Sequence, residues 1–181
     1  MNIFLRPATI DDGHLIVKWR NSPSVSMHCF NRTPVTLESN EAFFRRYVET
    51  GCYKQFIVER FDEFTGVVRY PIATVYLKDI DYHNKRCQLC IFTSDDEEWN
   101  TESQQMAIRK LLIIAFEELG MHKVYSYVFS MYDDERELLE NSGLKKEALL
   151  KEEAIGPDGT YYDVYRMTLR DDEYKSLNIK R

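Results

Sequence analysis

Residues 99–124 read WNTESQQMAIRKLLIIAFEELGMHKV, and this stretch decides the fold class. Its apolar residues recur at the spacing of one helix face: Met106, Ala107, Leu111, Leu112, Ile114, Ala115 and Leu119. Gly120 follows as the residue that ends the helix, because glycine readily adopts the left-handed conformation found there. The pattern predicts the longest helix of the chain over residues 101–119 and a strand over residues 123–129.

Strands and helices are also predicted on either side of this stretch. Downstream, we expect a short helix over 133–141 and a hairpin of residues 144–154 and 161–169, which turns at Gly156-Pro157-Asp158-Gly159. Upstream, β-rich runs predict strands over residues 3–6, 56–58, 72–77 and 86–92, with a hairpin bend at 62–66. The rest of the first fifty residues is predicted to be helical, over 10–19, over 25–30 and from Thr36 to Gly51.

The composition is that of one ordinary globular domain. The chain has 181 residues, 44% of them hydrophobic, and 24 basic against 30 acidic residues give a net charge of −6. This sign disfavours nucleic acid as a partner. Because no run approaches the roughly 18 apolar residues of a membrane span, and no secretory leader is present, we expect a soluble cytoplasmic protein without a membrane partner. We expect a single domain over residues 1–170 and a charged, frayed tail over residues 171–181.

The four cysteines do not predict a metal site. Only Cys87 and Cys90 are close in sequence, and on a strand residues three apart point to opposite faces. The four histidines show no metal-binding spacing either. We therefore interpret the cysteines as free buried thiols and expect no metal.

The order and spacing of these segments carry a family resemblance. The strand over 86–92, the acidic loop over 94–98, Trp99, the long helix and Ser142-Gly143-Leu144 resemble the GCN5-related N-acetyltransferases (GNAT). More narrowly, the chain resembles the branch that acetylates ribosomal-protein N-termini and nucleotide-linked amino sugars, in Leu5-Arg6-Pro7, Trp19-Arg20-Asn21, Ile80-Asp81, residues 116–124 and Tyr162-Asp163-Val164-Tyr165-Arg166. The resemblance implies an α+β (α/β/α) fold with a single mixed, mostly antiparallel sheet, splayed between strands that end at Phe92 and Phe129.

The resemblance also implies acetyl-CoA as the co-substrate. Its pantetheine arm would pair with strand backbone in the splayed wedge, at Ile91, Phe92 and Thr93. Its diphosphate would lie on the loop formed by Trp99, Asn100, Thr101, Glu102, Ser103 and Gln104. The family's paired glycines fall on Glu102 and Gln104, and residues 95–98 are all acidic. Both features argue against tight, ordinary CoA binding.

The usual catalytic groups are replaced as well. Gln88 stands where the family often has a glutamate base, and a carboxamide accepts no proton near neutral pH. Leu139 stands where a tyrosine often protonates the leaving thiolate, so Tyr132 is the substitute donor that the sequence offers. Positioning of an already neutral amine still accelerates transfer, by up to about 7–11 kcal/mol.

For the acceptor, Trp19, Arg20 and Asn21 are the predicted binding residues, with Arg45 and Arg46 nearby in the helical region. The alternative is that Trp19 is a core aromatic and that Arg45 and Arg46 form a solvated helix face. The first hypothesis is transfer of an acetyl group to a primary amine of a small molecule, an amino sugar or a protein N-terminus. The alternatives are a catalytically weak or inactive member of the fold that binds a metabolite or protein partner, and a transferase with another acyl donor. A homodimer is the assembly we consider.

Overall fold

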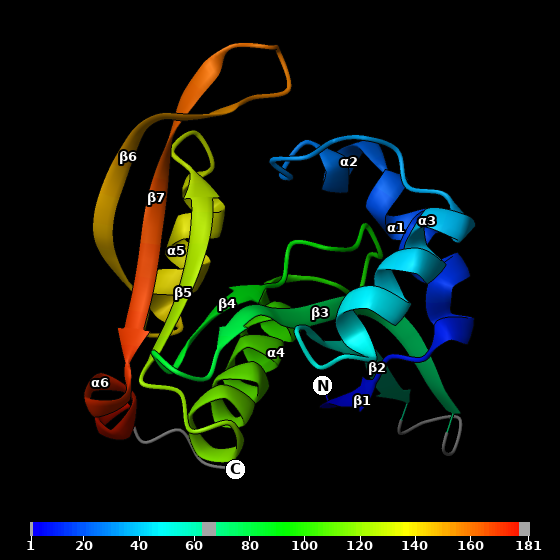
Figure 1. The fold of residues 1–181 in the computed structure, drawn as a ribbon, viewed down its shortest axis with the longest axis horizontal. Coiled ribbons are helices and arrows are strands. Elements are labelled where there is room, and N and C mark those ends of the chain that lie inside the picture. The colour runs from blue at the N-terminus through cyan, green and yellow to red at the C-terminus, as the bar shows by residue number, and fades with distance from the viewer. Residues whose placement is uncertain (1, 63–67, 178–181) are drawn as a thin grey trace.

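The strands of the computed structural model, which describes residues 2–62 and 68–177, form one sheet (Figure 1). Within these residues the spatial order is β1-β2-β3-β4-β5-β7-β6. Only the β4–β5 pair is parallel, which confirms the predicted α+β fold with a mixed, mostly antiparallel sheet. The predicted bend at 62–66 lies outside the described residues apart from Asp62. The strands are β1 (Asn2–Pro7), β2 (Lys54–Asp62), β3 (Val68–Asp81), β4 (Arg86–Cys90), β5 (Lys123–Phe129), β6 (Lys145–Ile155) and β7 (Tyr161–Arg170).

Most helices begin and end where the sequence signals predict. The long helix is α4 (Thr101–Ile113) with a π-helical last turn (Ile114–Glu118), and Gly120 follows with φ 64°. The short helix is α5 (Asp133–Asn141), and it ends before Gly143 with φ 100°. The remaining helices are a 3₁₀ turn (Ile10–Asp12), α1 (Gly13–Asn21), α2 (Pro23–Ser26), α3 (Leu37–Phe43) with a π-helical extension (Phe44–Val48), and α6 (Asp171–Ser176).

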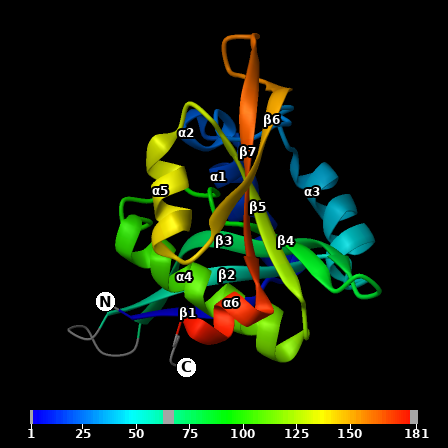
Figure 2. The same cartoon turned by 90° about the vertical axis from the view of Figure 1, so that its left-hand side faces the viewer.

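Helices cover both faces of the sheet and enclose two cores. Neighbouring residues of β2 point to opposite faces, so Val58 joins the larger core under α4 and Ile57 the smaller core under α1 and α3. The smaller core also holds Trp19 and Phe44. In two perpendicular views the β6–β7 hairpin projects past the ends of the other strands (Figure 1 and Figure 2). The helices α1 to α3 therefore cover one half of the sheet, and the β6–β7 hairpin extends the other half.

The helix predicted over residues 25–30 is wrong in its second half. It starts at Pro23 and ends at Ser26, after which the chain runs as a loop towards Thr36. In this loop the side chain of Asn31 accepts a hydrogen bond from the backbone N–H of Thr33 at 2.9 Å. Such a local turn competes with helix formation, which the apolar pattern alone does not reveal.

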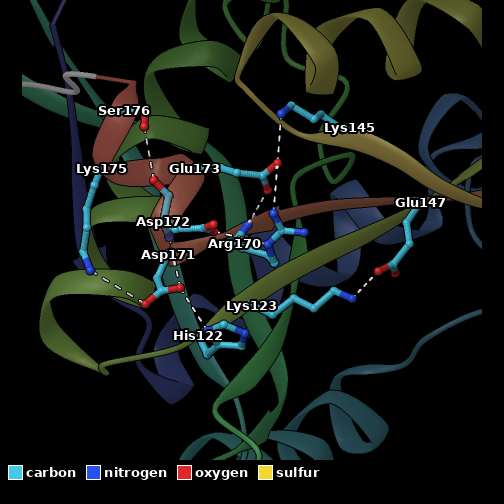
Figure 3. A network of polar contacts seen from close by, with 10 residues as sticks. All are labelled: His122, Lys123, Lys145, Glu147, Arg170, Asp171, Asp172, Glu173, Lys175 and Ser176. Atoms are coloured by element: carbon cyan, nitrogen blue, oxygen red, sulfur yellow. Dashed lines mark hydrogen bonds and ion pairs between the residues drawn. The ribbon is translucent and has the colours of Figure 1, made fainter.

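The C-terminal segment contains the ordered helix α6 instead of a frayed tail (Figure 3). Its first turn is tied to neighbouring segments: His122, just before β5, pairs with Asp171 at 2.9 Å, and Lys145 of β6 pairs with Glu173 at 2.8 Å. Tyr174 is 8% exposed and packs in the larger core. One buried aromatic ring therefore orders a segment whose charge suggested solvation; the end of the predicted tail lies outside the described residues.

Candidate active site

The sheet opens between β4 and β5 (Figure 1). The two backbones pair over three positions, of which the last joins Gln88 to Tyr125. Beyond it β4 stays paired with β3 and β5 with β7, so the parallel neighbours separate. The Ser126 hydroxyl reaches across the start of the opening and donates to the Leu89 carbonyl at 2.9 Å. A cavity of about 300 Å³, the wedge cavity, lies here.

Gln88 lines the wedge cavity, where it was predicted to stand in place of a base. It is 8% exposed, and its cross-strand neighbour Lys78 lines the same cavity. Among the described residues around this cavity there is no carboxylate. The wedge therefore supplies no carboxylate base at the position of Gln88, and the imidazole of His28 is the group on its wall that can accept a proton near neutral pH.

A second cavity, the helix-side cavity, has a volume of about 420 Å³ and lies where α1 and α3 cover the sheet. Arg20, Tyr76, Phe92 and Thr93 line both this cavity and the wedge cavity, so the two cavities are adjacent. The apolar part of its wall comes from Ile16, Pro34, Val35, Phe43 and Phe92. A small, largely apolar chamber thus lies next to the open part of the sheet.

The three predicted acceptor residues lie at the end of α1 but face different surroundings. Trp19 is 3% exposed in the smaller core, which confirms the core alternative for this residue. The Asn21 amide donates to the Val35 carbonyl at 2.7 Å and accepts from the Val35 N–H at 2.8 Å, so it holds the loop in place. Arg20 lines both adjacent cavities and donates from Nη2 to the Asn31 carbonyl. Of the three, Arg20 is the residue whose side chain lines a cavity.

Arg45 and Arg46 are exposed residues of the π-helical turn after α3. Arg45 pairs with Glu41 at 2.9 Å, and the Arg46 guanidinium lies 5.3 Å from the centre of the Tyr47 ring. Neither lines the helix-side cavity, so they form the solvated helix face that the sequence offered as an alternative.

The N-terminus of α4 adjoins the wedge, and Asn100 is its N-cap. The Asn100 Oδ1 atom accepts hydrogen bonds from the backbone N–H groups of Glu102 at 3.1 Å and Ser103 at 3.2 Å. The Gln104 N–H donates to the Asn100 carbonyl at 2.9 Å. Helix N-termini bind phosphates through free N–H groups of this kind. Because Asn100 already uses two of them, α4 presents no ready diphosphate site.

A third cavity, the α5-side cavity, has a volume of about 400 Å³ and separates α4 from α5. Residues from α4 and the preceding loop line one side, and Asp134, Glu135 and Glu137 line the other. His28 forms an ion pair with Glu135, but burial outweighs it and raises the pKa of Glu135. The carboxylates oppose a diphosphate, so this end does not fit that part of CoA, whereas the wedge has room for its uncharged arm.

The other residues predicted to hold the donor divide into two groups. Residues 91–93 line the wedge cavity, because β4 ends at Cys90 and frees them from the ladder. Trp99 is 5% exposed, and its Nε1 atom donates to the Ile91 carbonyl at 3.1 Å. Trp99, Thr101 and Gln104 line the α5-side cavity. By contrast, Asn100 and Ser103 build the helix end, and the Glu102 side chain is exposed.

The predicted proton donor, Tyr132, precedes α5 as its N-cap residue. Its hydroxyl donates to the Met27 carbonyl at 3.2 Å, and burial raises its pKa. Its ring centre lies 4.3 Å from that of His28. Leu139 is fully buried in the larger core, so the position of the family's tyrosine serves packing in this chain. The Tyr132 hydroxyl thus ties α5 to the loop after α2.

Sequence reasoning missed Tyr76, Lys78 and Arg32. Tyr76 and Lys78 are two residues apart on β3 and both line the wedge cavity, a spacing that could have been read from strand alternation. Arg32 donates from Nη2 to the carbonyls of Ile155 at 2.6 Å and Gly156 at 2.8 Å. It thereby ties the loop over the helix-side cavity to the tip of the β6–β7 hairpin, a contact that no local pattern announces.

No helix among residues 2–62 and 68–177 has both the length and the apolar character to cross a membrane. Within the same ranges no three histidine, cysteine or acidic side chains gather as metal ligands. All four cysteines are free thiols, although Cys52 is exposed. Cys87 is buried in the larger core and Cys90 lines the wedge cavity, on opposite faces as predicted.

The comparisons with known proteins agree with this geometry. A family model described as the acetyltransferase (GNAT) domain matches residues 2–145, whereas no curated protein matches the chain. A spermidine N-acetyltransferase from Vibrio cholerae, solved with CoA and spermine, has a TM-score of 0.85 at 22% identity over 96% of this chain and 98% of that chain. A dodecameric form of the Vibrio cholerae enzyme has a TM-score of 0.79 at 23% identity, over 97% and 98%. These likenesses support the fold, and the family match spans most of the sequence: the chain belongs to the GNAT acetyltransferases.

Proposed function

We propose that the protein transfers an acetyl group from acetyl-CoA to a primary amine. The observation that carries this proposal is the shared wall of the wedge cavity and the helix-side cavity, at Arg20, Tyr76, Phe92 and Thr93. In an acetyltransferase the donor and the acceptor have to meet from two sides. Two adjacent cavities that share these wall residues meet that requirement.

The residues of this chain would act mainly by positioning. Acetyl-CoA, when bound, supplies the activated thioester. Residues 91–93 would form the wall along its pantetheine arm, and Trp99 holds that wall through the Ile91 carbonyl. Gln88 orients groups by hydrogen bonding but removes no proton, and Tyr132 has to exchange its Met27 partner before it can donate one. We therefore expect slow turnover, because an acid or base contributes typically 10²- to 10⁴-fold.

The acceptor and the assembly are finer proposals. The Vibrio cholerae neighbours are named for spermidine and one is dodecameric, whereas the residues Trp19-Arg20-Asn21 resemble the ribosomal-protein and amino-sugar branch. We propose a small amine rather than a protein N-terminus, because the helix-side cavity of about 420 Å³ matches a small ligand. We propose a homodimer, to be measured by light scattering after size exclusion.

A second candidate is a GNAT-fold protein that binds a ligand without acyl transfer. Two observations favour it: Asn100 occupies the N–H groups at the start of α4, and carboxylates from α5 line the adjoining cavity. Such a protein would not need a diphosphate site. The two candidates differ in whether the wedge accepts CoA.

The deciding experiment is a calorimetric titration with acetyl-CoA, CoA and dephospho-CoA, followed by a thiol-release assay with a panel of primary amines. The proposed transferase should bind acetyl-CoA saturably and release CoA thiol when an amine is added. Ligand at 100 times its dissociation constant should also stabilise the fold by about 2.7 kcal/mol. No heat and no thermal shift at millimolar acetyl-CoA would contradict the transferase and support the second candidate.

A further inference from the structure

We propose that the helix-side cavity takes a compact primary amine that carries an apolar body and one anionic group, a carboxylate or a phosphate, and that Arg20 binds this group. The inference rests on the proposed function only in treating the occupant as an acyl acceptor. Binding itself can be measured without the donor.

The charge of the cavity wall is the first observation. Among the described residues that line the helix-side cavity none is acidic, and Arg20 is the basic one. The adjacent wedge cavity adds Lys78 and His28 and again no carboxylate. A ligand in these cavities therefore meets the charges of Arg20 and Lys78 without a carboxylate on the wall, while His28 is paired with Glu135 of the α5-side cavity.

The surroundings of Arg20 are the second observation. Its Nη2 atom donates to the Asn31 carbonyl, which anchors the guanidinium at the cavity wall. In the described part of the chain Arg20 has no carboxylate partner. It lies beside Tyr76 and Cys29, whose pKa values are raised by burial, while the charge of Arg20 counteracts the rise. Arg20 is half-buried, so a guanidinium at this wall attracts an anion more strongly than one in bulk water, and its planar fork suits carboxylate or phosphate.

The same geometry disfavours polyamines. A polyamine is cationic at both ends, so whichever end does not react would lie near Arg20 without a carboxylate to balance it. A group of carboxylates lines the α5-side cavity instead, where Glu135 already pairs with His28. The fold resemblance to spermidine N-acetyltransferases therefore does not extend to the acceptor chemistry.

The apolar wall sets the body of the ligand. Ile16, Val35, Phe43 and Phe92 supply methyl groups and rings, so a chain of methylenes or a small ring gains by leaving water there. A sugar with many hydroxyl groups would leave them without partners against these residues. We thus expect an aliphatic or aromatic amine with its anionic group at the far end from the nitrogen.

Two probes of matched length test the inference on the protein alone. The compound 5-aminopentanoate carries a carboxylate at one end, whereas 1,5-diaminopentane carries an amine at both ends. Calorimetry should show 5-aminopentanoate binding at least about 10-fold more tightly than the diamine and than spermidine. The probe 3-aminopropyl phosphate distinguishes a phosphate preference from a carboxylate preference, and either preference supports the proposal.

Variants show whether Arg20 is responsible. Arg20→Gln should weaken 5-aminopentanoate binding by about 10- to 100-fold, and Arg20→Lys should restore part of it because the charge remains. The matched control is Arg109→Gln, on the exposed face of α4, which should leave binding unchanged. Circular dichroism of each variant separates loss of binding from loss of fold.

Three binding results would each overturn the inference: the diamine binds as tightly as 5-aminopentanoate, no probe binds at millimolar concentration, or Arg20→Gln keeps the preference of the wild type. Its failure is distinct from that of the proposed function. If 5-aminopentanoate binds through Arg20 and no amine is ever acetylated, the transferase is refuted and the anion-bearing ligand stands. If spermidine is acetylated with high efficiency, the transferase stands and this inference fails.

Discussion

Replacing Asn100 by glycine tests whether the N-terminus of α4 can hold a diphosphate. In the structure the Asn100 side chain occupies the N–H groups of Glu102 and Ser103, at 3.1 and 3.2 Å. Glycine is itself an accepted N-cap residue, so the substitution releases both donors while the helix keeps its starting point. The chain would then present the free N–H groups that an anion requires.

The expected magnitudes follow from these two hydrogen bonds. Asn100→Gly should lower the free energy of unfolding by only a few tenths of a kcal/mol, whereas Asn100→Ala should lower it by about 1 kcal/mol. A hydrogen bond to a charged group contributes about 1.5–3 kcal/mol. Because Glu102 remains nearby and repels the phosphates, we expect a total gain in binding free energy of only about 1.5 kcal/mol, the lower limit for a single such hydrogen bond. This gain corresponds to about 10-fold tighter CoA binding.

The assay is a calorimetric titration of wild type and variants with CoA and with pantetheine. Pantetheine has no diphosphate, so its affinity should not change and serves as the internal control. Glu102→Gly combined with Gln104→Gly should tighten CoA binding further, since it removes a charge and two side chains. The reasoning is refuted if Asn100→Gly loses the expected stability while its affinity for CoA stays at the wild-type value.

Three further predictions concern the frame around the site. Burial acts to raise the pKa of Asp12, but hydrogen bonds, chiefly from Arg6, hold this pKa below its ordinary value. The ionised carboxylate therefore stabilises the fold at neutral pH, and this stabilisation is lost as the pH falls through the folded-state pKa. Denaturant titrations between pH 7 and pH 2 should show a smaller acid-induced loss of unfolding free energy for Asp12→Asn than for wild type. Arg32→Gln should speed hydrogen exchange at the β6–β7 tip and cost about 1 kcal/mol or less; unchanged exchange would contradict the tie. Burial raises the pKa of Cys87 to about 12, so mass spectrometry after thiol labelling should find the exposed Cys52 modified first; early labelling of Cys87 would contradict its placement.

The fold was predictable where the signal is local. The apolar periodicity of residues 101–119 and the glycine after them suffice to predict α4, because the apolar side chains that recur at helical spacing face the core. The helix expected over 25–30 and the frayed tail were wrong for two different reasons. The Asn31 turn is a local hydrogen bond that competes with the helix, and Tyr174 is buried against residues distant in sequence. Hydrophobic patterning registers neither effect.

The candidate site was predictable in part for the same reason. Consecutive residues on a helix point about 100° apart, so Trp19, Arg20 and Asn21 could not all face one ligand. In the structure Trp19 lies in the smaller core, Arg20 lines the helix-side cavity, and Asn21 binds the loop at Val35. Likewise, comparison with the family's paired glycines located the change in the diphosphate loop at Glu102 and Gln104. It did not identify Asn100 as the side chain that accepts hydrogen bonds from the first N–H groups of α4.

The groups that oppose CoA binding belong to the packed structure, and this has a kinetic consequence. Asn100 caps α4 and Glu135 pairs with His28, while Leu139, at the position of the family's tyrosine, lies in the core. The acceptor end keeps an open cavity with Arg20 on its wall. Donor binding should therefore limit the proposed reaction more than acceptor binding does. In steady-state kinetics, Asn100→Gly should lower the KM for acetyl-CoA and leave the KM for the amine unchanged. An equal change in both constants would show that the two cavities do not work separately.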